Sequence, residues 1–373
     1  MNFEYSEEQQ QLADSIGKYL ANEYSFEKRK TILTSPSGLS DAAWTTFAEL
    51  GLTSIALPEA DGGFGGGALD LMAAMEACGE ALVVEPLLDN IVGGRLVSRA
   101  GSAAQREAML PGLMAGSLKL AFAGLEPGGR YALTPSKTHA RAAGDGWVLD
   151  GEKCVVFGAS SADTLVVSAL AGPAGGVSLF LVDRHAAGVT LNPSRSVDGQ
   201  RAADVGLVGV KLAAGALLGP LGAARPLIEE AVDFATALLC ADAIGAMKSA
   251  NDATLEYMKT RKQFGVPIAS FQVLQHRMVE MYIVCEQARS LAILAAAKVD
   301  AGGDAADRSR AVSMAKVKIA DAARQISQES VQLHGGMGMT EELKVSHTFR
   351  RLTMAAQRFG DADHHLERYA ALG

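Results

Sequence analysis

The sequence is poor in cysteine, and its cysteines follow no pattern. Only four occur in 373 residues, and Cys78, Cys154, Cys240 and Cys285 are too widely scattered to form a paired spacing. Zinc sites and disulfide frameworks both depend on recognisable spacings between thiols. We therefore expect reduced thiols, no metal site, and a protein of the cytoplasm, where thiols stay reduced.

Basic charge, long apolar runs and a secretory signal are also missing. The formal net charge is -8, which argues against a surface for nucleic acid or an anionic membrane. No apolar run approaches the roughly 20 residues of a membrane helix. The chain starts with the acidic stretch MNFEYSEEQQQLADSI, which lacks the basic segment and apolar core of a signal peptide. We therefore expect no secretion and no membrane insertion.

What remains is a globular chain that changes its periodicity twice. Hydrophobic residues make up 49% of it and charged residues 20%, and the length suits two or three domains. Residues 1–117 show helical spacing, residues 118–218 show short apolar strands between turns, and residues 219–373 show long helical stripes. We predict an α+β multidomain fold with an N-terminal helical domain, a small central β-barrel or sandwich, and a C-terminal antiparallel helical bundle.

The N-terminal domain contains a glycine-rich stretch at residues 62–67 that invites two interpretations. It is either a phosphate-binding loop or a structural turn. The stretch lacks the Lys-Ser/Thr pair of a P-loop and does not fit G-x-G-x-x-G, so we favour the turn. Earlier in this domain, Ser6 before two glutamates predicts a helix start.

The central domain is predicted from short strands and turn residues. Two strands are predicted at residues 147–150 and 154–157, and the first ends at Asp150, which Gly151 follows. Because Asp-Gly is a typical hairpin corner, we predict a turn there. Other strands are predicted at residues 164–168, 177–182 and 207–211.

The C-terminal domain is predicted to consist of long helices joined by short loops. Ser270 is expected to be the N-cap of the second of them, since serine is a preferred cap. The predicted helices cover residues 226–260, 270–301, 305–334 and a last stretch from Glu341.

Arg261 lies in the loop between the first two of these helices. Its planar guanidinium has a permanent charge and paired donors that suit a phosphate. An arginine at this place also suits the carbonyl groups at a helix C-terminus. On this stretch alone we favour the helix-capping interpretation over a phosphate contact.

Several short motifs occur in the same order as in one family, and the chain resembles the acyl-CoA dehydrogenases over nearly its whole length. Each motif is weak alone, but together they are specific. They are Leu57-Pro58-Glu59, Glu126-Pro127-Gly128, Gly151-Glu152-Lys153, Arg261-x-Gln263-Phe264-Gly265-x-Pro267-Ile268, Phe271-Gln272, and Gln332-x-His334-Gly335-Gly336-Met337-Gly338.

The resemblance implies a flavoenzyme that desaturates an acyl-CoA thioester. A carboxylate removes the α-proton while FAD accepts the β-hydride, and an electron-accepting flavoprotein reoxidises the flavin. It also implies a tetramer in which each subunit reaches with an arm to the FAD of its neighbour. The residues that match this arm are Arg261, Gln263 and Phe264 for the pyrophosphate, Phe271 and Gln272 for the adenine side, and Gln332, His334, Gly335 and Gly336 for the glycine-rich contact loop.

The catalytic position departs from the family pattern. Most members have Glu-Gly-Thr where this chain has Phe359-Gly360-Asp361, and a minority use a carboxylate at the position of Ala235. Neither phenylalanine nor alanine can take a proton. Asp361 and the nearby Asp233 and Asp363 are interpreted as solvated or helix-capping residues.

The positions that normally hold the flavin ring have changed as well. The usual threonine is Leu125, and the usual tryptophan and Thr/Ser are Val155 and Phe157. Asp361 replaces a threonine, and its negative charge would repel a pyrophosphate. The arm for a neighbour is therefore kept, whereas the chain's own ring and base positions are not.

Three hypotheses follow. The chain is a subunit that contributes to FAD bound across an interface in a heterotetramer with a homologous, base-bearing partner. Alternatively, it is a complete flavoenzyme with non-standard acyl-CoA chemistry, or a flavin-free scaffold subunit. The ending at residues 359–366 resembles the small subunits of bacterial heteromeric acyl-CoA dehydrogenases, including the pimeloyl-CoA dehydrogenase type.

Overall fold

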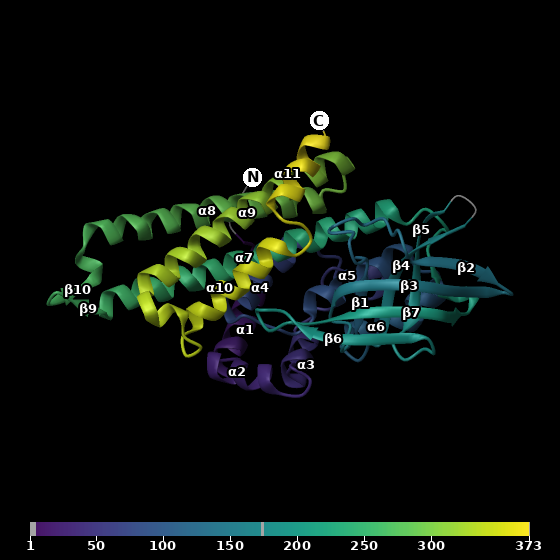
Figure 1. Ribbon diagram of the computed structural model, residues 1–373, viewed down its shortest axis with the longest axis horizontal. Coiled ribbons are helices and arrows are strands. Elements are labelled where there is room, and N and C mark those ends of the chain that lie inside the picture. The colour runs from purple at the N-terminus through teal and green to yellow at the C-terminus, as the bar shows by residue number, and fades with distance from the viewer. Residues whose placement is uncertain (1–4, 173–174, 373) are drawn as a thin grey trace. The chain divides into compact units, whose positions relative to one another are not determined.

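A computed structural model describes residues 5–172 and 175–372, and the chain divides into two compact units (Figure 1). The helical unit contains the chain up to Thr31, Gly67–Val83, and everything from Thr236 onward. The β unit contains Ile32–Gly66 and Val84–Ala235. Each unit is described by itself.

The helical unit is built mainly from long helices that the sequence pattern predicts well. Ser6 caps α1 and forms a capping box with Gln9, which confirms the predicted helix start. The chain is helical in this unit at α1 (Glu7–Glu23), most of α2 (Phe26–Thr34), α4 (Ala68–Ala81), most of α7 (Arg225–Thr260), α8 (Gln272–Asp300), α9 (Ala305–His334), η4 (Gly335–Met339), α10 (Lys344–Gln357) and α11 (Ala362–Ala371).

The predicted start of the second long helix was wrong by two residues. Ser270 lies in the short helix η3 (Ile268–Ser270), and its hydroxyl donates to the carbonyl oxygen of Pro267 at 2.7 Å. Because that local bond engages the hydroxyl, Ser270 does not cap α8, and Phe271 is the N-cap residue without a side-chain cap.

Helices α4 and α7 approach each other at backbone distance. A Cβ atom at Gly79 would lie 1.9 Å from the carbonyl oxygen of Asp242, and one at Gly245 would lie 1.8 Å from that of Glu76. Only glycine fits at either position. The two glycines therefore bring α4 against α7 without intervening side chains.

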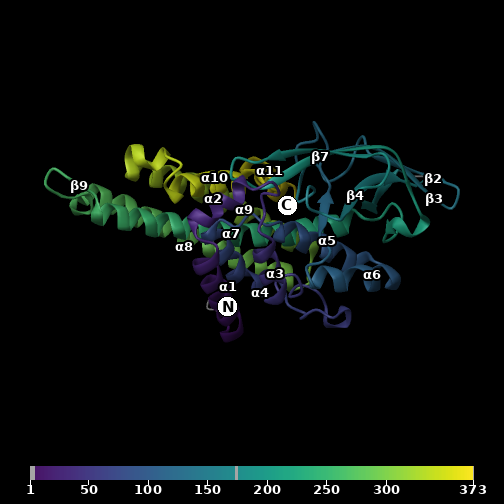
Figure 2. The same cartoon turned by 90° about the horizontal axis from the view of Figure 1, so that it is seen from below.

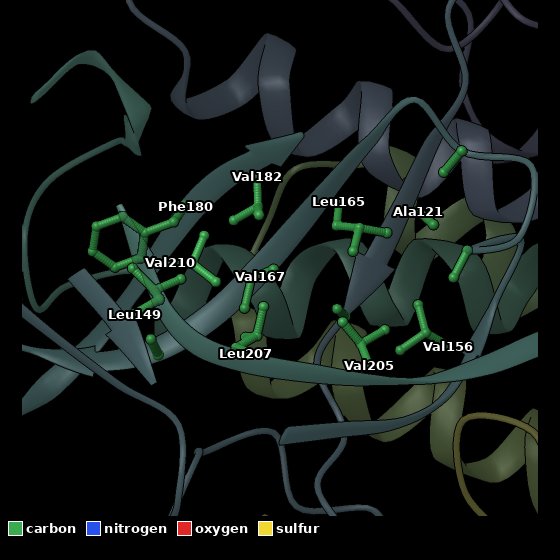
Figure 3. Close-up of a cluster of buried hydrophobic side chains, with 14 of the residues drawn as sticks. Ala121, Leu149, Val156, Leu165, Val167, Phe180, Val182, Val205, Leu207 and Val210 are labelled. Atoms are coloured by element: carbon green, nitrogen blue, oxygen red, sulfur yellow. The ribbon is translucent and has the colours of Figure 1, made fainter. Parts of the chain in front are cut away.

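The β unit surrounds one hydrophobic core (Figure 3). Side chains from most of its strands, among them Leu149, Leu165, Phe180 and Val205, point into this core. The described strands form one sheet in the order β6-β7-β3-β2-β4-β5-β8, and β1 pairs with β4. They are β1 (Leu120–Ala123), β2 (His139–Ala143), β3 (Gly146–Phe157), β4 (Thr164–Ala171), β5 (Gly176–Asp183), β6 (Val189–Arg195), β7 (Arg201–Leu212) and β8 (Leu217–Leu218).

The helices of the β unit occur mostly before its first strand. They are α3 (Asp41–Glu49), η1 (Glu59–Asp61), α5 (Leu87–Ala100), α6 (Ala103–Met114) and η2 (Ala214–Ala216), and this unit also includes the ends of α2 and α7 that the helical unit leaves out. Ser40 caps α3 through the backbone N–H of Ala43. The expected plan of helical domains around a central β domain is confirmed.

The hairpin predicted at Asp150-Gly151 does not exist. Both residues lie inside the continuous strand β3, where Gly151 has a φ of 151° at a register shift against β7. The Asp150 carboxylate accepts the backbone N–H of Gly209 at 2.6 Å. The actual corner is Gly144-Asp145 between β2 and β3, and Gly144 has the left-handed φ of 62° that such turns favour.

The glycine-rich stretch is a structural turn, as predicted. The backbone N–H groups of Gly63 and Gly65 donate to the carbonyl oxygens of Pro58 and Leu57, at 3.0 and 2.8 Å. In the helical unit, the N-terminal amides of Ala68 and Leu69 in α4 donate to the Asp300 carboxylate at 2.7 and 2.9 Å. These amides are therefore already engaged within the chain and are not offered to a phosphate.

No helix of the described residues is both long and apolar enough to cross a membrane.

Candidate functional site

The segment after α7 folds into a small hairpin with a strained turn. Strands β9 (Lys262–Gln263) and β10 (Val266–Pro267) are joined by Phe264 and Gly265, whose φ angles are 55° and 83°. Positive φ at both positions is typical of a type I′ turn, where phenylalanine is an unfavourable residue. The Phe264 side chain is also 91% exposed. An aromatic ring that is both strained and exposed suggests a binding surface.

Arg261 presents a free guanidinium from a fixed backbone. Its N–H donates to Tyr257 at 2.8 Å, and its carbonyl oxygen accepts the N–H of Ile268 at 2.9 Å. Its exposed side chain makes no hydrogen bond or ion pair with the described residues. The helix-capping interpretation therefore has no support, and the guanidinium is available to a ligand.

The second predicted segment lies at the end of α9, where it contacts the last turns of α7 through Tyr257. A Cβ atom at Gly335 or Gly336 would meet nothing within 4 Å, so a ligand has room to approach the backbone. His334 is buried, stacks on Tyr257 with ring centroids 4.4 Å apart, and donates from Nδ1 to the Ser330 carbonyl oxygen at 2.8 Å. Burial lowers the pKa of His334. Its ring joins the two segments and is already engaged within the chain.

The remaining predicted residues lie at the start of α8. The rings of Phe264 and Phe271 meet edge to face at 6.1 Å, and Gln272 is exposed on the first turn. Figures 1 and 2 both show β9 at the end of α7 and α8. All nine predicted arm residues therefore lie in the helical unit. Tyr257 connects the end of α7 to the end of α9, and Phe271 connects the hairpin to the start of α8.

Large exposed apolar side chains are concentrated near this arm. They belong to the end of α7, the hairpin, the first half of α8, and η4. They are Leu255, Phe264, Val266, Val273, Val279, Tyr282, Ile283, Met337 and Met339, with exposed fractions from 38% to 91%. Such a concentration is typical of a surface that another chain covers.

The two predicted base positions carry no group that can take a proton. Phe359 has a left-handed φ of 61°, and Ala235 is fully buried. Asp361 is the N-cap of α11 and accepts the N–H of His364 at 2.9 Å, so its predicted capping role is confirmed. The prediction that Asp233 is solvated or caps a helix was wrong, because it is fully buried inside α7, whereas Asp363 is exposed in the first turn of α11.

Two buried side chains that sequence reasoning missed hold the turn around Phe359. Lys316 donates to the carbonyl oxygens of Ala356 and Gly360, at 3.1 and 2.6 Å, and burial lowers its pKa to about 8. His365 contacts the Phe359 carbonyl oxygen at 3.2 Å. The signal for Lys316 is a lysine inside the apolar stripe of α9, between Val312 and Ile319.

The positions predicted to match the flavin ring lie in the β unit and carry apolar side chains. The backbone oxygen of Leu125 accepts a hydrogen bond from the N–H of Cys154 at 3.0 Å. Val155 is half exposed at a φ of 50° and donates its N–H to Asp204 at 3.0 Å, beside a register shift in β3. Phe157 is half-buried. None of the side chains of Leu125, Val155 and Phe157 can donate to a flavin.

The other two family motifs of the β unit, at residues 126–128 and 151–153, each contribute one residue to a buried ion pair. Lys153 lies 3.1 Å from Glu126 and also donates to the Ser168 hydroxyl, and burial lowers its pKa to about 8. Burial would raise the pKa of Glu126, but hydrogen bonds from Ser136 and Thr138 and the Lys153 charge together hold it well below its usual range. These motifs therefore serve the structure of the domain.

The described residues fit one part of a dinucleotide better than another. The arm offers an unpaired arginine, an exposed aromatic ring and open glycine backbone, which suit a diphosphate and an adenine. The ring-side positions offer Leu125, Val155 and Phe157 without polar groups. The groups of the arm would fit the diphosphate and adenine of FAD, whereas the side chains at the predicted ring and base positions supply no polar group to it.

Comparison with known proteins identifies the family. The family models for the N-terminal, middle and C-terminal domains of acyl-CoA dehydrogenase match residues 6–117, 121–211 and 221–371. The acyl-CoA dehydrogenase FadE12 of Mycobacterium tuberculosis (strain ATCC 25618 / H37Rv) is 31% identical over 358 residues, which cover 92% of this chain and 90% of that protein.

Two solved structures are also similar. One, a variant of the steroid ACAD described as Tcur3481-Tcur3483, has a TM-score of 0.88 at 30% identity and covers 98% of this chain and 97% of its own. The other, PigA with FAD and proline, has a TM-score of 0.91 at 25% identity and covers 100% and 98%. The chain therefore belongs to the acyl-CoA dehydrogenase family of oxidoreductases, flavoproteins whose cofactor is FAD.

Proposed function

We propose that this chain is a subunit of an FAD-dependent acyl-CoA dehydrogenase that desaturates an acyl-CoA thioester, and that it lacks the usual catalytic base. Its arm contributes to FAD bound mainly by a homologous, base-bearing partner in a heterotetramer. The observation that carries the proposal is the contrast between the free guanidinium of Arg261 and the proton-inert side chains of Phe359 and Ala235.

The arm residues have distinct proposed roles toward the cofactor. Arg261, Gln263 and Phe264 would contact the pyrophosphate, and Phe271 with Gln272 would flank the adenine. Gln332, His334, Gly335 and Gly336 form the contact loop, to which His334 contributes through its backbone because its ring stacks on Tyr257. When bound, FAD supplies a hydride acceptor. The arm's part in the reaction is to hold and orient it.

Several further features belong to the same proposal. The three domains cover residues 1–117, 118–218 and 219–373, and the enzyme is cytoplasmic. An electron-accepting flavoprotein takes the electrons. The similarity to the solved steroid ACAD, whose description joins Tcur3481 with Tcur3483, supports a mixed assembly. The likeness to pimeloyl-CoA dehydrogenase small subunits supports it too.

Arg261→Ala is the first test. The assembled complex is purified through a tag on this chain, and its flavin content per chain is measured by absorbance after denaturation. We expect a loss of about tenfold or more in FAD affinity, because a charge-assisted fork to a phosphate contributes roughly 1.5–3 kcal/mol. Arg261→Lys keeps the charge without the fork and should recover only part of the affinity.

Lys262→Ala is the matched control, since it removes the same charge from the adjacent exposed position. We expect little change in flavin content from this variant. Unchanged flavin in Arg261→Ala would contradict the proposed arm. The chain expressed alone should bind little FAD and desaturate nothing, and full loading with desaturation would identify it as a complete flavoenzyme instead.

A further inference from the structure

The connection between α10 and α11 is held in a conformation that its sequence does not favour. Phe359 lies at a φ of 61° and Gly360 at 123°. A Cβ atom at Gly360 would lie 2.5–2.9 Å from the rings of His364 and His365, so only glycine fits. A bulky residue in the left-handed region persists only where its surroundings over-determine the backbone.

Lys316 is one of the side chains that fix the backbone of this turn. It lies fully buried in α9, and its ammonium group bridges the carbonyl oxygens of Ala356 and Gly360 across the turn. Within the described part of the chain, no carboxylate forms an ion pair with it at salt-bridge distance. The charge of Asp361 acts on this ammonium, and the two carbonyl oxygens accept its hydrogen bonds, so this turn and the adjoining helix ends supply interactions that offset the cost of its burial.

His365 contacts the carbonyl oxygen of Phe359, which lies between the two residues that Lys316 contacts. Its Nε2 lies 3.2 Å from the Phe359 oxygen and its Nδ1 lies 3.2 Å from the Ser313 hydroxyl. A carbonyl oxygen only accepts, so Nε2 carries the hydrogen and Nδ1 accepts from Ser313. Lys316 and His365 together engage the carbonyl oxygens of residues 356, 359 and 360.

We propose that Lys316 and His365 are positioning residues that keep position 359 ready to present a carboxylate, so that the single change Phe359→Glu installs a working general base. This rests on the proposed function, which treats position 359 as the base position of the family. The turn has lost its acid group but has kept the side chains that fix its backbone.

The step is a proton transfer. The C–H bond α to the thioester breaks, its proton moves to the carboxylate introduced by Phe359→Glu, and the electron pair stays on the substrate as an enolate. The reverse transfer returns a deuteron when the solvent is D2O. No oxidant is needed, so the step is measurable without turnover.

The test uses the full chain purified alone, with and without added FAD, and a 3-thia-acyl-CoA that cannot be desaturated. Deuterium uptake at its α-carbon is followed by mass spectrometry. We expect Phe359→Glu to exchange about 10²-fold faster than wild type, since a positioned general base contributes 10²–10⁴-fold. Gln357→Glu introduces the same charge in the same turn and should exchange no faster than wild type.

The positioning role is tested in the Phe359→Glu background. Lys316→Met should lower the exchange rate at saturating ligand about tenfold or more with little change in the half-saturating concentration, because a shifted base loses geometry rather than binding. His365→Asn is the second variant if Lys316→Met does not fold, as judged by circular dichroism.

Two results would overturn the inference. One is Phe359→Glu exchanging no faster than wild type, and the other is a folded positioning variant exchanging as fast as its parent. Neither of these two results depends on the residues of the arm. The role of the arm is tested separately, by the flavin content of Arg261→Ala. Exchange by Phe359→Glu together with flavin-insensitive Arg261→Ala would support position 359 as the base position and would remove only the part of the proposed function that assigns FAD contacts to the arm.

Discussion

At the scale of single residues, the chain keeps the buried carboxylate of Glu126 by surrounding it with several partners. Glu126 accepts backbone N–H groups from Ser136, Lys137 and Thr138 as well as the Lys153 ammonium. A buried ion pair adds little net stability by itself, but removing one member leaves an uncompensated charge. Glu126 therefore fixes the start of β2 rather than serving catalysis.

Glu126→Gln should destabilise the protein by about 3–5 kcal/mol, since it leaves Lys153 buried without a counter-charge. Chemical denaturation at pH 7 measures the change in the free energy of unfolding. Glu152→Gln is the matched control, because Glu152 pairs with Lys137 at an exposed site. Its loss should cost about 0–1 kcal/mol. Equal effects of the two substitutions would contradict the structural role of Glu126.

The same carboxylate gives the wild type an acid-sensitive contribution. The pKa of Glu126 is held below its unfolded value of 4.5, so the unfolded state binds more protons between the two values. The stabilisation is fully present above about pH 4.5 and is lost as the pH falls through the folded pKa. We expect the difference in unfolding free energy between wild type and Glu126→Gln to shrink below pH 4.5 in an acid titration series.

Sequence motifs predicted the arm residues but not their physical setting. Arg261 and Phe264 could be proposed because their motif is local, and a local motif is readable without a fold. Lys316 and His365 were missed because their partners include residues of other elements that lie up to 52 residues away in the chain. His334 was assigned to the contact loop by its motif, whereas its buried ring contacts Tyr257 from a distant part of the chain.

At the scale of elements, helix spacing predicted positions well and strand pairing poorly. The bounds of α9 were predicted to the residue, because a long amphipathic stripe ends at two glycines. The Asp150-Gly151 corner was wrong, because a β-bulge uses the same residues as a hairpin turn. Whether a glycine ends a strand or bends it depends on the neighbouring strand, which local sequence does not contain.

Gly245→Ala tests the close approach of α4 and α7. Alanine normally stabilises a helix interior by about 1 kcal/mol relative to glycine. Here its Cβ would lie 1.8 Å from the Glu76 carbonyl oxygen, a backbone atom that cannot move without its helix. We expect a loss of about 1–3 kcal/mol, as for overpacked cores, measured as a lower denaturation midpoint.

Gly17→Ala is the control for this prediction. Gly17 lies in the interior of α1, and a Cβ atom there would meet nothing within 4 Å. Propensity alone should then raise stability by about 0.5–1 kcal/mol. Opposite signs for the two substitutions identify the packing of α4 against α7 as the cause. A stabilising Gly245→Ala would mean that the helices separate easily.

At the scale of the whole molecule, the exposed apolar side chains support the proposal that this chain is a subunit. Val279, Tyr282 and Ile283 lie on the exposed face of α8 with exposed fractions of 55%, 62% and 47%. Soluble monomers rarely leave such a contiguous face uncovered. This face of α8 lies in the same unit as Arg261 and the rest of the arm. Under the proposed function, binding of the partner subunit would cover the apolar face and would also bring FAD to the arm.

Val279→Glu should therefore weaken the assembly and the binding of FAD together. A buried, unpaired carboxylate is strongly unfavourable in an apolar interface. We expect the purified complex to dissociate at concentrations where wild type stays assembled. Analytical ultracentrifugation measures this, and flavin content is read on the same samples.

Val208→Glu is the control for this prediction, since Val208 is 75% exposed on a strand of the β unit and belongs to none of the segments around the arm. It introduces the same charge in place of the same side chain and should leave the assembly intact. If Val279→Glu dissociates the complex but leaves FAD bound at full affinity, the arm does not serve a neighbour's cofactor. If neither variant changes the assembly, the apolar face of α8 is not the subunit interface.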